Sequence, residues 1–402
     1  MSTSTETIEV PISILRGGTS RAVFFSPELL NEPREVVEGI LLNVMGSPDP
    51  RQINGIGGAT PQTSKVAFVG VSQRADADVD YTFAQVDITR SFVDWGGNCG
   101  NISSAVGPYA VNNGLVEPVP DGELQTVRIF NTNTSKIIRS RFPVIGGRAM
   151  IGGDTRIAGV PSTGARIDLE FEDPTGAVTG STLPTGNPRD SLTLKDGTTV
   201  DVSIVDAANP TVFVRPEAVG IAGTESPAEL DANIAMLGRL EEIRSIAAVM
   251  LGLADTAENA TAVTPGLPKI GVVAPPAGYV ASDGNEIATE DMDVLVRMMS
   301  MQHPHRACQI TAGICTGVAS TIPGTLVNEI HDASQLMSVD KAHDVRLGHP
   351  SGLMITAVRG EVEDALRPSI AGVAVVRTAR GILDGVVHVP RSLFPREHAV
   401  EP

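Results

Sequence analysis

Short apolar runs, many of them alternating with polar residues, dominate the chain. Runs of this kind that are rich in Val, Ile and Thr and bounded by turn-forming residues are typical of β-strands. The pattern predicts strands at residues 9–15, 65–71, 80–86, 124–131, 200–205, 211–214, 270–273, 352–359 and 372–377. Because 41 glycines and 28 prolines separate such runs, we predict an α+β chain in which strands form the majority.

Helical periodicity occurs in fewer segments. Residues 27–44 and 228–251 place apolar residues three or four positions apart with charges between them, which predicts amphipathic outer helices. Residues 101–112 and 316–322 are short, uncharged and rich in Ala, Ser, Gly and Val, which is typical of a helix enclosed by strands. Both are preceded by a glycine and a cysteine. This similarity indicates an internal duplication with one buried helix in each half.

The length of 402 residues favours two domains, and the segment 173–190, rich in Gly, Pro and Thr, is the best candidate for their boundary. No apolar run approaches the ~18 residues that a membrane-spanning helix needs. Residues 1–9 lack the basic start and apolar centre of a secretory signal. We therefore expect a cytoplasmic protein with no membrane partner.

The composition also limits the ligands. A net charge of −17 argues against nucleic acid, because phosphate binding depends on clusters of Lys and Arg. The three cysteines, Cys99, Cys308 and Cys315, match neither a disulfide framework nor a zinc site. The sequence has no nucleotide-binding or metal-binding motif either, so we expect no metal and no cofactor.

The stretch DWGGNCGNISSAVGPYA, residues 94–110, places Cys99 just before one of the uncharged helices. If the helix begins near Asn101, the N–H groups of Gly100 and Asn101 lack intrahelical partners and the dipole puts partial positive charge beside the thiol. A substrate carboxylate can bind there, the thiol becomes more reactive, and Asn98 can hydrogen-bond a polar ligand. The alternative is an inert core cysteine in a glycine turn.

Lys65 is one of only five lysines and follows a loop rich in Gly and Thr in GIGGATPQTSKVAFV. A lysine that is partly desolvated or near other cations can be neutral near pH 7 and act as a base, with Ser64 beside it as a short donor. A solvated lysine at the start of a strand is the alternative.

Weaker candidates lie in turns. In ILRGGTSRAVFF, Arg16 can bind a carboxylate through two nitrogens while Thr19 and Ser20 add donors, although a plain hairpin would have the same sequence. The turns LPTGN, ANPTVFV and GHPSG contain residue types that form turns without any ligand. His303, His305 and Arg306 can bind a carboxylate, but capping a helix is the simpler interpretation.

Several of these motifs, taken in order along the chain, are similar to those of a known enzyme family. RGGTSRAVFF, NGIGGATPQTSKVAFV, FVDWGGNCGNISSAVGPYAV, LPTGN, IPGTLVN and GHPSG follow one another from Arg16 to Gly352. Together they closely resemble the 2-methylaconitate isomerase family, or PrpF family, whose relatives include 4-oxalomesaconate tautomerases and methylitaconate and aconitate isomerases.

The resemblance implies a diaminopimelate-epimerase-like fold, in which two pseudo-symmetric strand-rich barrel domains each wrap around a central helix and the active site lies between them. It implies an N-terminal domain of residues 1–188, completed by 380–402, and a C-terminal domain of residues 189–379. It also implies that Asn209 faces the cleft from the second domain.

The resemblance further implies that Lys65 is the catalytic base and Cys99 the active-site thiol. The implied substrate-binding residues are Arg16, Thr19, Ser20, Asn54, Ser64, Asn98, Gly100, Asn101, Thr185, Gly186, Asn187, Asn209, Cys315, Thr316, His349, Ser351 and Gly352. Lys65 would remove a proton from a carbon next to a conjugated double bond, and donors would stabilise the dienolate. Rotation before reprotonation gives a cis–trans change, and reprotonation at the distal carbon gives an allylic shift. Cys99 either returns the proton or only positions the substrate.

We therefore expect a cofactor-independent isomerase of small unsaturated di- or tricarboxylates, as a monomer or homodimer. DWGGNCGN is closer to the methylaconitate branch, so 2-methylaconitate or aconitate is preferred to 4-oxalomesaconate or methylitaconate. The cleft should be locally positive despite the acidic chain.

Two rival functions stay open. A two-thiol amino-acid epimerase would use both Cys99 and Cys315, which we expect at the head of the second buried helix. The order Asn-Cys-Gly-Asn departs from the epimerase motifs, and Arg21 stands where lysine is common in the family. A non-catalytic accessory protein would bind a carboxylate without needing Lys65.

Overall fold

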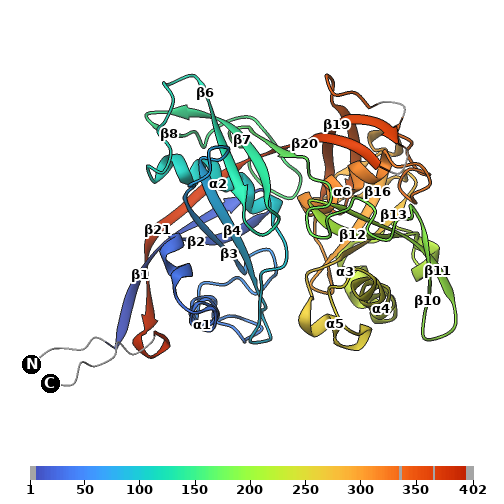
Figure 1. Cartoon of the computed structure of the whole chain (residues 1–402), viewed down its shortest axis with the longest axis horizontal. Helices are drawn as coiled ribbons and strands as arrows, with labels where there is room; N and C mark the ends of the chain where they lie inside the picture. The colour runs from blue at the N-terminus through green and yellow to red at the C-terminus, as the bar shows by residue number, and fades with distance from the viewer. Residues whose placement is uncertain (1–5, 335–336, 365–366, 395–402) are drawn as a thin grey trace, which may run out of the picture.

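The computed structural model describes residues 6–334, 337–364 and 367–394 of the chain. Two lobes lie side by side in Figure 1. One lobe contains β1 to β8 with α1 and α2, and the other contains β10 to β19 with α3 to α6. The red strand β21 leaves the second lobe and returns to β1 in the first.

The elements of the first lobe alternate strands with two helices. They are β1 (Thr7–Gly17), β2 (Ser20–Phe25), a 3-10 helix (Pro27–Asn31), α1 (Arg34–Met45), β3 (Lys65–Val71), β4 (Val79–Val86), β5 (Val93–Asp94), α2 (Gly100–Asn112), β6 (Leu124–Asn131), β7 (Lys136–Ile145), β8 (Arg148–Ala149) and β9 (Ile167–Glu172).

The second lobe has more helices on its outside. Its elements are β10 (Asp190–Thr193), β11 (Thr199–Ala207), β12 (Asn209–Val214), a 3-10 helix (Pro216–Val219), α3 (Pro227–Ala232), α4 (Ile234–Met250), α5 (Ala257–Val263), β13 (Lys269–Ala274), β14 (Tyr279–Val280), β15 (Glu286–Ile287), a 3-10 helix (Thr289–Asp291), β16 (Val294–Ser300), β17 (His303–Pro304), α6 (Ile310–Ser320), β18 (His343–His349), β19 (Gly352–Asp364) and β20 (Arg367–Arg377). β21 (Ala379–Pro390) and a last 3-10 helix (Arg391–Leu393) follow.

The order of strand pairing in the first lobe recurs in the second. β2 is parallel to β3 across α1, β3 is antiparallel to β4, and β4 is parallel to β6 across α2. In the same way β12 is parallel to β13 across α3 to α5, β13 is antiparallel to β16, and β16 is parallel to β18 across α6. A parallel pair needs a crossover connection, and each lobe makes two of them with helices. The repeat follows the pairing order that an internal duplication would produce.

The strand predictions are confirmed at all nine places, with ends that shift by a few residues. The predicted helix 27–44 is interrupted at Pro33, because proline restricts the residue before it to extended geometry, and Glu32 has ψ 156°. The predicted helix 228–251 is divided at Asn233 into α3 and α4. None of the helices in the described residues is long and apolar enough to cross a membrane.

The two uncharged helices, α2 and α6, are buried almost completely, as their composition predicts. The expected start of the second at Thr316 is wrong, because α6 begins at Ile310 and Cys315 lies in its middle. Gly313, which precedes the expected start, lies within α6 and packs against Met354, whose Cε atom occupies the place of a Cβ. Cys315 therefore does not lie at the head of the helix, where the sequence analysis expected it.

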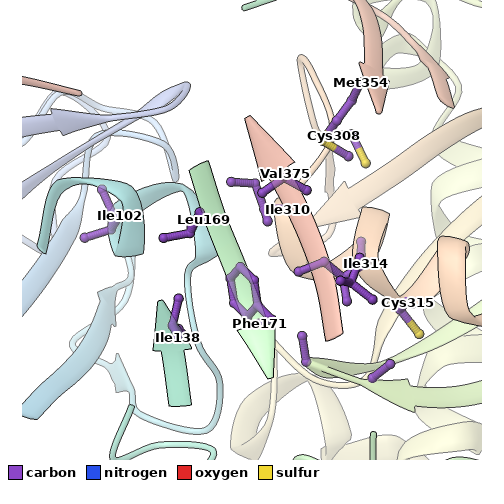
Figure 2. Close-up of a cluster of buried hydrophobic side chains, with 14 of the residues drawn as sticks. Ile102, Ile138, Leu169, Phe171, Cys308, Ile310, Ile314, Cys315, Met354 and Val375 are labelled. Carbon is purple, nitrogen blue, oxygen red and sulfur yellow. The ribbon is translucent and has the colours of Figure 1, made fainter. Parts of the chain in front are cut away.

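One hydrophobic core joins the two lobes. β9 and β20 pair antiparallel, with Phe171 opposite Val373. Figure 2 shows Leu169 and Phe171 on β9 between Ile102 of α2 and the side chains of α6. The helices also meet directly, because a Cβ on Gly100 would lie only 2.7 Å from side-chain atoms of Ile310.

We predict that Gly100→Ala lowers the stability of the protein, because the added methyl group would push the starts of α2 and α6 apart. Overpacking of this kind costs about 1 to 3 kcal/mol. Urea unfolding measures the change. Gly238→Ala is the matched control: this exposed glycine in α4 has open space around it, so the same substitution should stabilise by up to about 1 kcal/mol. An unchanged midpoint for Gly100→Ala would contradict the close contact.

Candidate functional site

A pocket lies where the N-terminal ends of α2 and α6 meet, and both lobes contribute to its wall. The cavity volume is about 50 Å³, within about 640 Å³ of empty space that includes open solvent. The first lobe contributes Ser20, Pro61, Gln62, Lys65, Phe83, Gln85, Asp94, Gly97, Asn98, Cys99, Gly100 and Asn101. The second contributes Gly266, Leu267, Lys269, Ser300, Met301, His305, Gln309, Ile310 and Thr311.

Lys65 is the first residue of β3 and is only 8% exposed. Its Nζ donates a hydrogen bond of 2.5 Å to Oε1 of Gln85, directly opposite on β4. The amide of Gln85 is held in this orientation because its Nε2 donates to the carbonyl oxygens of Ser64 (2.9 Å) and Pro61 (3.2 Å). Gln85 therefore fixes the position of the amine without providing a negative charge that would compensate an ammonium.

Cys99 is the N-cap of α2 and is partly exposed in the pocket. Its carbonyl oxygen accepts from the backbone N–H of Ser103 at 3.0 Å, so the helix begins directly after the thiol. Gln309 holds the same place at the start of α6, where its carbonyl accepts from the N–H of Gly313 at 2.9 Å. The first N–H groups of a helix have no intrahelical partner, so both helices direct donors and partial positive charge toward one pocket.

Asn209 connects the two sides of the pocket. Its Nδ2 donates to the carbonyl oxygen of Asn98 (3.0 Å) and to Oγ1 of Thr311 (3.1 Å), and its Oδ1 accepts from the N–H of Asn98 (3.2 Å). Because Asn209 is fully buried, these bonds are shielded from water, and losing one partner would leave a costly unpaired group. Asn209 thus supports the wall from behind.

Two polar atoms in the wall have no hydrogen-bond partner among the described residues. They are Oγ of Ser20, which is 3% exposed, and Oε1 of Gln309, whose Nε2 donates to the carbonyl of Met299 at 2.7 Å. Buried polar groups are nearly always paired, so both atoms are available to a polar ligand or to water.

The pocket is locally positive. Lys269 faces it from the second lobe, and desolvation together with the charge of Lys65 lowers the pKa of Lys269 to about 8. His305 is neutral at pH 7, because burial lowers its pKa to about 4 and its Nδ1 accepts from the N–H of Ala307. Two lysines thus face one carboxylate, Asp94, which agrees with the expected local positive charge inside an acidic chain.

Six of the residues expected from the sequence lie in the pocket wall, namely Ser20, Lys65, Asn98, Cys99, Gly100 and Asn101. Two more lie directly behind the wall. Asn209 makes the bonds described above, and the Ser64 hydroxyl donates to Oε1 of Gln52 at 2.9 Å while its carbonyl holds Gln85.

The structure places the other expected residues away from the pocket wall. Arg16 donates to the carbonyl oxygens of Gly18 and Thr378, and Thr19 accompanies it in that turn. Asn54 is exposed, while Thr185, Gly186 and Asn187 form a surface turn. Cys315 and Thr316 are buried within α6, and His349, Ser351 and Gly352 form the turn from β18 to β19.

Several pocket residues escaped sequence analysis, namely Gln85, Lys269, Gln309 and Thr311. Lys269 had a usable signal, since it is one of five lysines and directly precedes a predicted strand, while Lys65 begins one. His305 was noted in the sequence, but as a helix cap rather than a pocket residue. Gln85 and Thr311 carry no local signal, because strand pairing brings Gln85 to the site and the packing of α6 brings Thr311 there.

The model of the PrpF family, described as PrpF protein, matches residues 7–390. The chain belongs to the PrpF family. It is 43% identical over 389 residues to the 3-methylitaconate isomerase of Eubacterium barkeri, covering 96% of this chain and 98% of the relative. It is 38% identical over 395 residues to the 2-methyl-aconitate isomerase of Shewanella oneidensis, with the same coverage. The 4-oxalomesaconate tautomerase of Pseudomonas putida is 36% identical over 385 residues, covering 96% and 97%.

Solved structures agree with this assignment. A methylitaconate-delta-isomerase superposes with a TM-score of 0.75 at 40% identity, covering 99% of this chain and 100% of that one. A hydroxyproline epimerase from Agrobacterium vitis reaches a TM-score of 0.54 at 9% identity over 96% and 94% of the two chains, which shows a shared fold. The protein is thus an isomerase of the PrpF family with a strand-rich, mixed α and β fold like that of the proline racemases.

We predict that one thiol of the folded isomerase reacts quickly with an aromatic disulfide reagent. Cys99 is partly exposed, whereas burial raises the pKa of Cys308 and of Cys315 to about 12, so neither forms the reactive thiolate. Absorbance titration of native and urea-unfolded protein should count one and three thiols. Cys99→Ser should remove the fast reaction and Cys315→Ala should leave it unchanged. A second fast thiol in the native protein would contradict this geometry.

Proposed function

We propose that this PrpF-family isomerase moves a proton within a small unsaturated di- or tricarboxylate, without a cofactor. 2-Methylaconitate or aconitate is the preferred substrate, and 4-oxalomesaconate or methylitaconate is the alternative. The observation that carries the proposal is Lys65, a nearly buried amine held by Gln85 in a pocket into which two helix N-termini point. The names of the relatives support the substrate class, since they cover methylitaconate, methylaconitate and oxalomesaconate.

Binding would use the donors of both lobes. The free N–H groups at the starts of α2 and α6 and the unpaired hydroxyl of Ser20 can hold carboxylate oxygens on opposite sides of the pocket. Asn101 stands in the first turn of α2, where its Oδ1 accepts from the N–H of Thr19 at 3.3 Å and ties the helix to the β1–β2 turn. A substrate with two or more carboxylates would satisfy both ends at once.

Lys65 would then act as the base. Its neutral amine removes a proton from the carbon next to the double bond, and the electron pair spreads through the conjugated system to the carboxylate oxygens. Donors that point to those oxygens lower the barrier because they are already in place when the charge develops. Return of a proton to the same carbon after rotation gives a cis–trans change, and delivery to the distal carbon gives an allylic shift. Cys99 lies close enough to the pocket to donate that proton or to orient the substrate.

The proposal includes the architecture that the family likeness implies. The repeated pairing order supports two pseudo-symmetric epimerase-like barrel domains, residues 1–188 with 380–402 and residues 189–379, although 395–402 lie outside the described residues. The pairing of β21 with β1 supports the return of the chain to its first domain. A cytoplasmic location and a homodimer stay predictions.

The structure disfavours a two-thiol epimerase. The place that Cys99 occupies in the first lobe belongs to Gln309 in the second, and an amide cannot exchange a proton as a thiol does. Cys315 is fully buried within α6 and donates to the carbonyl oxygen of Val205 at 3.2 Å. A symmetric pair of thiol acid and base is therefore not available.

We expect the purified protein to convert at least one of 2-methyl-cis-aconitate, cis-aconitate, 4-oxalomesaconate and methylitaconate in deuterium oxide, with the reaction followed by proton NMR. Lys65→Ala and Lys65→Arg should both reduce turnover by about 100-fold or more, because neither can act as the base near neutral pH. Cys99→Ala distinguishes a proton donor from a positioning group. Turnover that survives Lys65→Ala would refute the assigned base, and exchange of an amino acid's α-proton would favour the epimerase.

Gln85→Glu should reduce turnover at pH 7 by about 10-fold or more, because a carboxylate beside Nζ stabilises the protonated form of Lys65. The loss should diminish as the pH is raised, and a series of initial rates from pH 6 to 10 measures it. Gln73→Glu adds the same charge to an exposed position and should leave the profile unchanged. Equal profiles for Gln85→Glu and the wild type would show that Gln85 does not control the protonation of Lys65.

A further inference from the structure

The second lobe presents a lysine at the position that corresponds to Lys65. Lys65 is the first residue of β3 and pairs with Ala22, the third residue of the parallel strand β2. Lys269 is the first residue of β13 and pairs with Thr211, the third residue of the parallel strand β12. Each lysine therefore follows the outer helical crossover of its lobe and starts a strand at the pocket.

The neighbouring positions correspond as well. Gln85, opposite Lys65, lies near the end of β4, and Ser300 ends β16 two positions beyond the pair formed by Gly271 and Met298. Both Gln85 and Ser300 line the pocket. The wall is thus built twice from the same elements, and the thiol is the part that the second lobe lacks.

Lys269 is weakly held. It is partly exposed to the pocket, and its Nζ makes one long hydrogen bond, 3.3 Å, to the carbonyl oxygen of Gly266. The chargeable groups that face it are Lys65 from β3, Asp94 from β5, Cys99 from the start of α2, and the neutral His305 that follows β17. An amine with few partners inside a ligand pocket is free to turn toward the ligand.

We propose that Lys269 is a second acid–base residue of the site, which exchanges a proton with the substrate from the side of the second lobe while Lys65 does so from the first. This inference rests on the proposed function. Two ammonium groups in one small pocket repel each other, which makes loss of one proton from the pair easier. Burial and the charge of Lys65 lower the pKa of Lys269 to about 8, so a state with one neutral lysine becomes populated as the pH nears 8.

The proton transfers balance. The neutral lysine takes a proton from one allylic carbon, and the electron pair of that C–H bond enters the conjugated system. The protonated lysine gives its proton to the other end of that system, where the electron pair forms the new C–H bond. The two amines have then exchanged protonation states, so they can catalyse the reverse reaction directly or be reset by exchange with water.

The alternative role for Lys269 is that of a cation that only binds a carboxylate, and Lys269→Arg separates the two roles. Arginine keeps the positive charge but stays protonated, so it can bind a carboxylate but cannot exchange a proton. Lys269→Gln is the companion variant, since it has no charge and a different size. A folding defect in one variant then leaves the other informative, and thermal unfolding checks both. Lys195→Arg, at a side chain that is 74% exposed, is the matched control.

Steady-state rates with the acid that the wild type converts, and deuterium uptake by NMR, provide the test. We expect both Lys269 variants to lose at least about 100-fold in kcat with little change in KM for Lys269→Arg. Lys269→Arg should still exchange a deuteron into recovered substrate through Lys65, without forming product. A bend near pH 8 in the wild-type rate profile should vanish in both variants and persist in Cys99→Ala, which excludes the thiol as its source.

Two outcomes would contradict the proposed role of Lys269. If the wild type isomerises its substrate and Lys269→Arg keeps kcat within a few-fold while KM rises, Lys269 only binds a carboxylate and this inference is wrong while the proposed function stands. If the wild type converts none of 2-methyl-cis-aconitate, cis-aconitate, 4-oxalomesaconate and methylitaconate, the proposed function and this inference fall together.

Discussion

The N-terminal ends of α2 and α6 can meet only because a glycine stands between them. At Gly100 any side chain would collide with Ile310, so the absence of a Cβ sets the distance between the two helices. Asn209 then fixes their relative position with three buried hydrogen bonds to Asn98 and Thr311. The unpaired N–H groups of both helices converge on one point as a result, and the pocket, its electrostatics and its ligand class depend on that convergence.

Such a site is expensive to build inside a protein. The pocket contains unpaired N–H donors, the unpaired side-chain oxygens of Ser20 and Gln309, and two lysines in a small volume. All of these groups oppose folding unless a ligand or water forms hydrogen bonds with them. The surrounding core offsets this cost. α2 and α6 are apolar and buried on nearly every side, and the pairing of β9 with β20 joins the two lobes in one hydrophobic cluster. An acidic surface and a positive pocket can therefore coexist within one chain.

The fold was predictable where one local rule applies. A continuous apolar run located β3 and alternation located β6 to the residue, and the lack of charge identified α2 as enclosed. Prediction failed where tertiary contacts decide: the helix was expected from Thr316, but α6 already includes Gly313, where Met354 packs against it. The start of that helix, and with it the environment of Cys315, was misplaced for this reason.

The residues of the candidate site were likewise predictable only where a local motif contains them. Lys65 and Cys99 stand in local motifs, so they were visible in the sequence. Gln85 reaches the pocket through strand pairing and Gln309 through helix packing, and no spacing along the chain predicts either position. The turn at Thr185 shows the converse, since it has the composition of a ligand loop but lies on the surface.

The pairing of β1 with β21 has a consequence for how the protein is made. β1 emerges first from the ribosome, yet its whole length from Thr7 to Gly17 is paired with residues that are synthesised about 370 positions later. During translation this strand has an open edge that cannot be closed by its final neighbour, and the contact of greatest sequence separation is the slowest to form. The first lobe must therefore wait for the second to be completed, so a ribosome that stalls before β21 releases a chain whose opening strand is an unprotected template for aggregation.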